Sequence, residues 1–308
     1  EWSFTGGASS SSLGTDDILR GFDKFEDVDN IEVDFLIAPE SIADANATTV
    51  VNDLVATASS LRKDCVAVAS PSRNAAITLG TNAAVLACNN TYTKSSYLVQ
   101  DNNYLKVFDK YNDQFIKIPA ASSTAGLMAA TDLVAANWFS PAGQRRGRYL
   151  GITDIELSPN KSERDTLYKA GINPIANIPG QGIMLFGDKT NESRPSAFDR
   201  INVRRLFLGI ERAIAIAGRN VMFEFNDEFT RAEFVNIVEP FLREIQGRRG
   251  ITDFRVVCDS TNNTAAVIDR NEFVASIFIK PARSINFVTL NFVAVRTGVE
   301  FEEVVGTV

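Results

Sequence analysis

The sequence contains no histidine among its 308 residues. Without an imidazole, the Ser-His-Asp and Cys-His forms of nucleophilic catalysis are excluded, and so are most zinc sites. The three cysteines, Cys65, Cys88 and Cys258, are far apart and form no C-x-x-C pair, so buried reduced thiols are expected. No run of about 18 apolar residues occurs, so no membrane-spanning helix is expected. These absences favour a structural or binding role over an enzymatic one.

Acidic residues outnumber basic residues by 38 to 31, which gives a net charge of −7. That balance argues against nucleic acid or an anionic membrane as a partner. The excess lies in residues 1–159, with 12 basic and 19 acidic groups, whereas residues 160–308 carry 19 of each. The change falls near Ser158-Pro159-Asn160, and it predicts two domains, 1–159 and 160–308.

Hydrophobic periodicity in the first domain predicts strands that alternate with helices. The expected strands are 31–37, the buried run 65–70 and a pair within 104–118, and the expected helices are 46–63, 81–92 and 122–138. Strands alternating with helices in this order are typical of an α/β domain.

The second domain is expected to be α/β as well. Capping boxes predict helices that begin at Ser162 and Thr230, and Gly218 is expected to end a helix that starts near Val203. The expected strands are 182–186, 221–225, 254–259, 272–281 and 284–296. The predicted fold class is therefore α/β (mixed α+β), with two domains, each a mixed sheet flanked by helices, and an extended β arm at the end.

The segment Gly182–Thr190 nearly matches a phosphate-binding loop, which requires G-x-x-x-x-G-K-[ST]. Here Asp188 stands before Lys189 and adds negative charge where a phosphate would bind. The four residues between the glycines are apolar, which favours a buried strand. No catalytic residue, metal or cofactor is predicted from this or any other motif.

Several arginines occur in clusters. Because a guanidinium group makes planar bidentate pairs and stacks on aromatic rings, arginine suits polar protein interfaces. Ordinary surface charge remains the alternative for each cluster. The candidates for polar contacts between protein subunits are Arg145, Arg146, Arg204, Arg205, Arg248 and Arg249.

The segment SINFVTLNFVAVR, residues 284–296, is apolar on both faces of an extended strand. Such a strand must be covered on both sides, either centrally in a sheet or by pairing with another subunit. Strand addition between subunits joins protomers through main-chain hydrogen bonds. The candidate residues for this exchange are Ile285, Phe287, Val288, Leu290, Phe292, Val293 and Val295.

Four segments together resemble the tail sheath proteins of contractile, T-even-type bacteriophages. They are ERDTLYKAGINPIANIPGQGIMLFGDKT, INVRRLFLGIERAI, VMFEFND and NFVAVRTGVEFEE, and they cover roughly residues 150–308. The segment NWFSPAGQRRG, residues 137–147, extends the resemblance into the first domain.

The resemblance implies a structural protein that polymerises as stacked hexameric rings around a tail tube and contracts to drive the tube through the host envelope. It implies that residues 1–159 are the carboxyl-side part of a middle domain and that residues 160–308 are the inner, tube-facing domain with a strand-exchange arm. The partners implied are other copies of the chain, the tail tube protein, and the baseplate and tail terminator proteins, with no nucleic acid and no membrane. The location implied is the virion, after assembly in the host cytoplasm.

The chain begins with Glu1 rather than Met, and it lacks the amino-terminal arm and outer domains of that family, so a carboxyl-terminal portion is expected. Two other interpretations remain open. One is a different structural or receptor-binding virion protein, and the other is an α/β enzyme that uses carboxylates or lysine.

Overall fold

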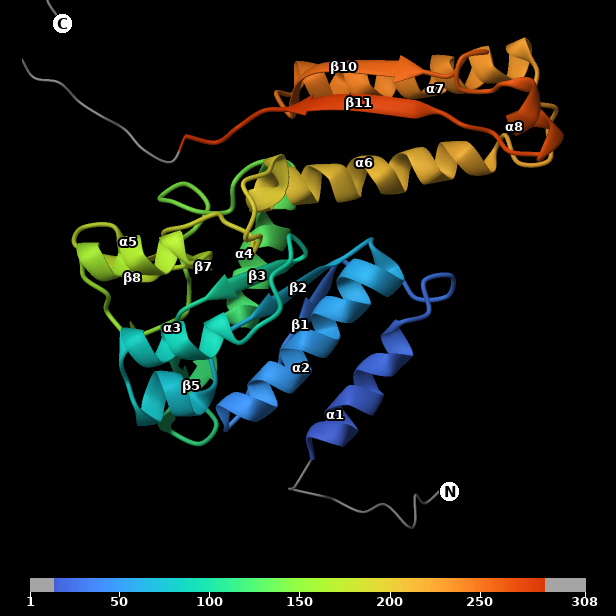
Figure 1. Cartoon of the computed structure of the whole chain (residues 1–308). Coiled ribbons are helices and arrows are strands. Elements are labelled where there is room, and N and C mark those ends of the chain that lie inside the picture. The colour runs from blue at the N-terminus through green and yellow to red at the C-terminus, as the bar shows by residue number, and fades with distance from the viewer. Residues whose placement is uncertain (1–13, 286–308) are drawn as a thin grey trace, which may run out of the picture.

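The computed structural model describes residues 14–285 (Figure 1). Its α-helices are α1 (Thr15–Phe22), α2 (Asp44–Ala56), α3 (Asn82–Asn90), α4 (Ala121–Val134), α5 (Lys161–Lys169), α6 (Ile201–Arg219), α7 (Glu228–Gly247) and α8 (Ala265–Asp269). Its strands are β1 (Phe35–Ile37), β2 (Val66–Ala69), β3 (Leu98–Asp101), β4 (Tyr104–Asp109), β5 (Gln114–Pro119), β6 (Asp154–Ile155), β7 (Ile172–Asn173), β8 (Ile175–Ile178), β9 (Gly182–Leu185), β10 (Ile251–Val257) and β11 (Ser276–Pro281). The mixed α/β class predicted from the sequence is confirmed.

The elements from α1 to β9 are referred to below as the α/β unit. A parallel sheet with the strand order β1-β2-β3-β7 forms its centre. Side chains of β2 alternate between two cores. Ala67 and Ala69 contact the core on the α2 and α3 side, whereas Val66 and Val68 contact the core on the α4 and α6 side. Both faces of the sheet are therefore covered, which is why the whole of β2 is buried, as its uninterrupted apolar run predicted.

Helix α2 covers one face of this sheet with a single apolar stripe. Val50, Val51, Leu54 and Val55 are all buried, at the spacing that a helix of 3.6 residues per turn requires. The helix predicted over 46–63 is confirmed, and its last turn, Thr57–Arg62, is π-helical.

Two smaller antiparallel sheets extend the α/β unit. One has the order β5-β4-β6, and the other is the hairpin of β8 with β9. The pair of strands predicted within residues 104–118 is confirmed. Strand β7 joins the central sheet by pairing with β3, so residues 172–173 add to the sheet that begins in residues 1–159. This pairing crosses the division expected near residue 159.

Helices α6 and α7 run antiparallel, and the hairpin of β10 with β11 lies along α7 (Figure 1). Their shared core contains Leu206 and Ile210 of α6 together with Phe234, Val238 and Leu242 of α7. Within residues 14–285, no helix is both long enough and apolar enough to span a membrane.

The strand predicted over 221–225 is wrong, because these residues form the turn that connects α6 to α7. The apolar side chains alternate there as in a strand, yet Met222, Phe223 and Phe225 are exposed to solvent and pair with no neighbouring strand. Periodicity alone could not separate an exposed turn from a half-buried strand.

In α5 and α7 the capping residue lies two or three positions earlier in the sequence than predicted. Asn160, not Ser162, caps α5, where its side chain accepts a hydrogen bond from Glu163 N and the Glu163 carboxylate accepts one from Asn160 N. Asp227 caps α7 by accepting a hydrogen bond from Thr230 N. Asn and Asp cap helices at least as well as Ser and Thr, so the earlier residue begins the helix.

Buried polar side chains lie at the carboxyl ends of β2 and β3. Asp101 accepts hydrogen bonds from the Ser70 hydroxyl at 3.0 Å, the Thr124 hydroxyl at 3.3 Å and Asn103 N at 3.2 Å. Its complete burial raises the pKa of its carboxyl group to about 7. The network joins the central sheet to α4, since Ser70 Oγ also accepts a hydrogen bond from Ala121 N.

We expect the contribution of Asp101 to the free energy of unfolding to fall as pH rises from about 4 to about 7. In this window the folded chain holds a proton on Asp101, whose pKa is about 7, while the unfolded chain has released it because the ordinary pKa is 3.8. One such group contributes at most about 1.4 kcal/mol per pH unit. Urea denaturation of the wild type and Asp101→Asn across this window should show that the wild type loses stability relative to the variant as pH rises. Equal slopes would show that Asp101 does not titrate there.

Candidate functional site: the α6 arginines and the terminal hairpin

Helix α6 is buried on two opposite faces and so joins the two parts of the molecule. Ile201 and Leu208 contact the core of the parallel sheet, whereas Leu206 and Ile210 contact the core of α7 and the β10–β11 hairpin. The helix predicted to start near Val203 is thus present, and both of these faces are apolar. The helix also continues one residue beyond Gly218, the predicted stop, and ends at Arg219.

Arg205 lies in the contact between α6 and the α/β unit. Its guanidinium group donates to the Met128 carbonyl at 3.0 Å, forms an ion pair with Asp132 at the carboxyl end of α4, and lies 5.1 Å from the centre of the Phe35 ring. The residue is 6% exposed, so burial of its charge is offset by three favourable contacts within the chain.

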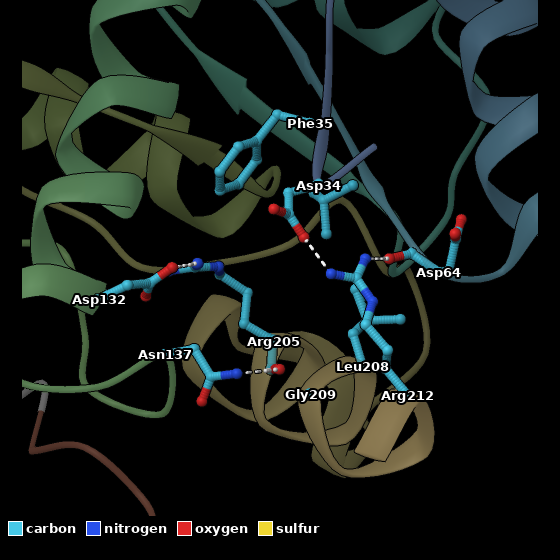
Figure 2. A pocket seen from close by; sticks show the side chains of 10 residues that line it. Asp34, Phe35, Asp64, Asp132, Asn137, Arg205, Leu208, Gly209 and Arg212 are labelled. Carbon is cyan, nitrogen blue, oxygen red and sulfur yellow. Dashed lines mark hydrogen bonds and ion pairs between the residues drawn. The ribbon is translucent and has the colours of Figure 1, made fainter. Parts of the chain in front are cut away.

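Arg212 lies two turns further along α6 and reaches the other side of the same contact (Figure 2). Its guanidinium group donates to Asp34 at 2.8 Å and to the carbonyl of Asp64 at 3.2 Å. A small pocket of about 80 Å³ separates the two arginines. Its lining residues are Asp34, Phe35, Asp64, Val66, Asp132, Asn137, Arg205, Leu208, Gly209 and Arg212.

Arg204 is directed to a different part of the α/β unit. Its guanidinium carbon lies 4.2 Å from the centre of the Tyr97 ring and 4.0 Å from that of Phe198, and the group donates to the Ser96 hydroxyl. Burial lowers the pKa of this arginine. The guanidinium groups of Arg204 and Arg205 thus contact residues of the same chain. From the sequence, both arginines were candidates for contacts between subunits.

The other candidate arginines are more accessible. Arg146 donates to the Ser140 carbonyl at 2.8 Å and lies over the Phe139 ring, and its neighbour Arg145 is exposed. Arg248 lies over the Trp138 ring at 4.9 Å and forms an ion pair with Glu244, while Arg249 is exposed. Arg145, Arg248 and Arg249 are therefore placed where another chain could reach them.

The β10–β11 hairpin has two open edges among the described residues, because each of its strands pairs only with the other. Backbone N–H and C=O groups at such edges can pair with a strand from another chain. Ile285 follows β11 and is exposed. The other residues predicted for strand exchange, Phe287, Val288, Leu290, Phe292, Val293 and Val295, lie outside the described residues.

The near match to a phosphate loop forms a different structure. Gly182–Leu185 is strand β9, as its apolar residues predicted. The Lys189 ammonium group donates to the Tyr168 carbonyl at 2.9 Å, and partial burial lowers its pKa.

Sequence reasoning missed the acidic partners of the α6 arginines. Asp34 and Asp132 lie 178 and 73 residues away from the arginines that they bind, so no local spacing could have identified them. It also missed the exposed aromatic turn between α6 and α7. The signal was present in VMFEF, but it was assigned to a strand.

Two family models match most of the chain. The model described as the phage tail sheath protein central domain matches residues 12–191, and the phage tail sheath C-terminal domain matches residues 193–294. The two matches meet between the β8–β9 hairpin and helix α6.

Two tail sheath proteins match nearly the whole of this chain. The chain is 42% identical to the tail sheath protein of Vibrio phage KVP40 and 40% identical to that of Enterobacteria phage T4. Each match covers 98% of this chain and 48% of the relative, so the chain spans about half the length of the curated relatives it matches.

Solved structures share the fold at low sequence identity. The helical sheath of the anti-feeding prophage in its contracted state matches with a TM-score of 0.74 and 19% identity, over 92% of this chain and 76% of that one. The sheath complex of an extracellular contractile injection system, PVC, in its contracted state matches with a TM-score of 0.72 and 19% identity, over 89% and 73%.

Removal of the Arg205 guanidinium group or of its carboxylate partner is expected to destabilise the fold. Arg205→Ala deletes a buried ion pair and a carbonyl hydrogen bond, which should lower the free energy of unfolding by about 3 kcal/mol. Asp132→Ala should cost on the order of 2–3 kcal/mol as well, because it leaves the buried Arg205 guanidinium group without a counter-ion, although the Asp132 side chain itself is 39% exposed. Denaturant unfolding followed by circular dichroism measures both, with Arg249→Ala as the exposed control. A loss in Arg205→Ala no larger than in the control would contradict the assignment.

Proposed function

The chain belongs to the phage tail sheath family, and on that premise we propose that it forms part of a contractile tail sheath. Copies of the chain polymerise as stacked hexameric rings around a tail tube, and the stack contracts to drive the tube through the host envelope. The observation that carries this proposal is the β10–β11 hairpin, which is open on both edges among the described residues.

Strand exchange through this hairpin is the proposed means of joining subunits. The segment 285–295 follows β11 after a few residues, and its sequence is apolar on both faces. A segment of that kind suits a position inside a sheet, and open edges of a neighbouring hairpin would supply one. Main-chain hydrogen bonds would then link each subunit to the next irrespective of side-chain contacts.

Contraction is proposed to be a rearrangement between rigid subunits. The extended stack would be metastable and the contracted stack lower in free energy, with the exchanged strands acting as hinges. The double burial of α6 supports rigid behaviour of the subunit, because a change in its position would expose apolar groups in two cores.

The proposed partners are further copies of the chain, the tail tube protein, and the baseplate and tail terminator proteins. The accessible Arg145, Arg248 and Arg249 are proposed as polar contacts between sheath subunits or with the tube. The location proposed is the virion tail, after assembly in the host cytoplasm. No catalytic activity is proposed, and the lack of histidine supports this.

Two domains are proposed, an outer α/β unit and an inner unit that carries the hairpin. The change in charge balance placed their division near residue 159. The pairing of β7 with β3 and the extent of the two family models support a division close to residue 192 instead.

Negative-stain electron microscopy of the purified full-length protein tests the sheath function. We expect striated hollow tubes, because heterologous contacts that do not close along the axis build helical stacks. A protein that yields only small closed rings at every concentration, with or without purified tail tubes as template, would contradict the proposal.

Strand exchange has its own test in Phe287→Asp and Leu290→Pro. A buried charge, or a proline that lacks an N–H donor, should abolish tube formation and leave a soluble subunit with unchanged circular dichroism. Tyr111→Asp, at an exposed turn 176 positions upstream of Phe287, serves as the matched control and should still form tubes. Normal tubes from the first two variants would refute strand exchange by this segment.

A further inference from the structure

The turn between α6 and α7 presents an unusual group of side chains to solvent. Phe223 and Phe225 are 102% and 84% exposed, and Met222 and Phe229 are also exposed. Acidic residues at Glu224, Asp227 and Glu228 lie among them. We refer to these seven residues, Met222, Phe223, Glu224, Phe225, Asp227, Glu228 and Phe229, as the tip. Large apolar groups gathered on a surface in this way mark interaction sites.

The tip is held in place by hydrogen bonds at its base. The Asn226 side chain donates to the Glu272 carbonyl at 2.8 Å and to Asn263 Oδ1 at 3.1 Å, and Arg231 donates to Asn226 Oδ1 at 2.7 Å. Phe223 has a backbone φ of 69°, in the left-handed region that bulky residues rarely adopt. The fold thus accepts an unfavourable backbone conformation at a ring that contacts nothing in the subunit, which indicates a function outside it.

The opposite end of α7 carries a surface of complementary character. Leu133 and Val134, at the end of α4, are 90% and 80% exposed. Arg248 lies beside them, because its guanidinium group donates to the Ala135 carbonyl at 3.4 Å, and Arg249 is exposed next to it. We refer to Leu133, Val134, Arg248 and Arg249 as the basic patch. It combines aliphatic side chains with positive charge, of which Arg248 is paired with Glu244 and Arg249 is exposed, whereas the tip combines aromatic side chains with negative charge.

The two surfaces cannot meet within one chain. The tip precedes α7 and the basic patch follows it, so the 20 residues of this helix, about 30 Å, separate them. Figure 1 shows the connection of α6 to α7 at the end of these helices that is remote from the parallel sheet, whereas α4 lies beside that sheet. The two surfaces of one chain therefore cannot pair with each other, whereas a neighbouring copy presents the complementary surface to each of them.

We propose that the tip of one copy binds the basic patch of a neighbouring copy in a head-to-tail contact. Such a contact is heterologous, and its repetition produces a ring or a helical array. Apolar contact would supply most of the attraction, and the opposite charges would set the orientation. This contact rests on the proposed sheath function, but it involves surfaces distinct from the β10–β11 edges.

Cysteine cross-linking in the full-length protein tests the contact. Within residues 1–308 the native Cys65, Cys88 and Cys258 are buried, so cysteines introduced at the surface of this part are preferentially reactive. A mixture of Phe225→Cys with Val134→Cys, treated with a short bismaleimide, should give heterodimers, and the double variant should give a ladder of higher species. Phe225→Cys mixed with Ile42→Cys, an exposed residue of the α/β unit, is the matched control and should give background yield.

Charge reversal provides the second measurement. Glu228→Lys and Arg249→Glu should each reduce the heterodimer yield several-fold, and their combination should restore it. Phe223→Gly separates association from folding, since it relieves the positive φ and removes the ring. It should unfold at the same or a higher denaturant concentration than wild type while cross-linking falls.

Each outcome bears on the contact separately from the sheath function. Heterodimers above control, with rescue by the double charge reversal, support it whether or not tubes form. Striated tubes without the heterodimer would leave the sheath function standing and overturn this contact. Homodimers of Phe225→Cys alone would show a tip-to-tip contact, and equal yields from the test and control mixtures would show non-specific encounter; either result overturns the proposal.

Discussion

The fold depends on helix α6 burying opposite faces in two separate cores. A helix with one apolar stripe would pack on one unit and leave the other attached by a connecting loop. Here Leu208 lies under the parallel sheet and Leu206 lies under α7, so displacement of the helix exposes apolar surface on both sides. The arginines add directional contacts to this burial: Arg205 is fixed by a carbonyl and a carboxylate of α4, and Arg212 by the segment before β1. A load applied at the β10–β11 hairpin therefore reaches the α/β unit through α6 and through the contact of Arg248 with Trp138.

The local sequence was sufficient where one periodic face decides the structure. The buried strand β2 follows from its uninterrupted apolar run, and helix α2 and the β4–β5 pair follow from their apolar spacing. It was insufficient for the α6 arginines, because an arginine at a surface and one buried against distant residues have the same neighbours in sequence. Arg205 is internal only because Asp132 and the Met128 carbonyl, more than 70 positions away, are brought to it by the sheet and α4. Net charge carries no information on which strands pair, so the division near residue 159 stays a prediction, and the pairing of β7 with β3 crosses it.

The turn after α6 is a second place where the local sequence was insufficient, because here residues predicted to be buried are exposed. Alternating Val221, Phe223 and Phe225 meet the criterion for a half-buried strand, and only the antiparallel packing of α6 on α7 removes that possibility. Phe223 and Phe225 are exposed to solvent and so contribute no burial energy to the folded subunit. Burial of either ring would contribute about 2 kcal/mol or more. Their exposure is consistent with a chain whose stable state is an assembly. The apolar residues at 221–225 led to the wrong strand prediction because their alternation is typical of buried side chains. In the isolated subunit these side chains are exposed, and the proposed contact with a neighbouring copy would bury them.

The carboxyl ends of parallel strands are where open α/β sheets usually bind ligands. In this chain that position is filled by the protein's own side chains. Asp101 is enclosed by Ser70 and Thr124, and Asn102 accepts a hydrogen bond from Ile175 N. A carboxyl group with a pKa of about 7 would suit acid–base chemistry if substrate could reach it, but Asp101 is 0% exposed. Its hydrogen bonds instead tie β3 to α4, the same helix that holds Arg205. The polar residues that an α/β enzyme would direct at a substrate here connect the parallel sheet to α4, which in turn contacts Arg205 of α6.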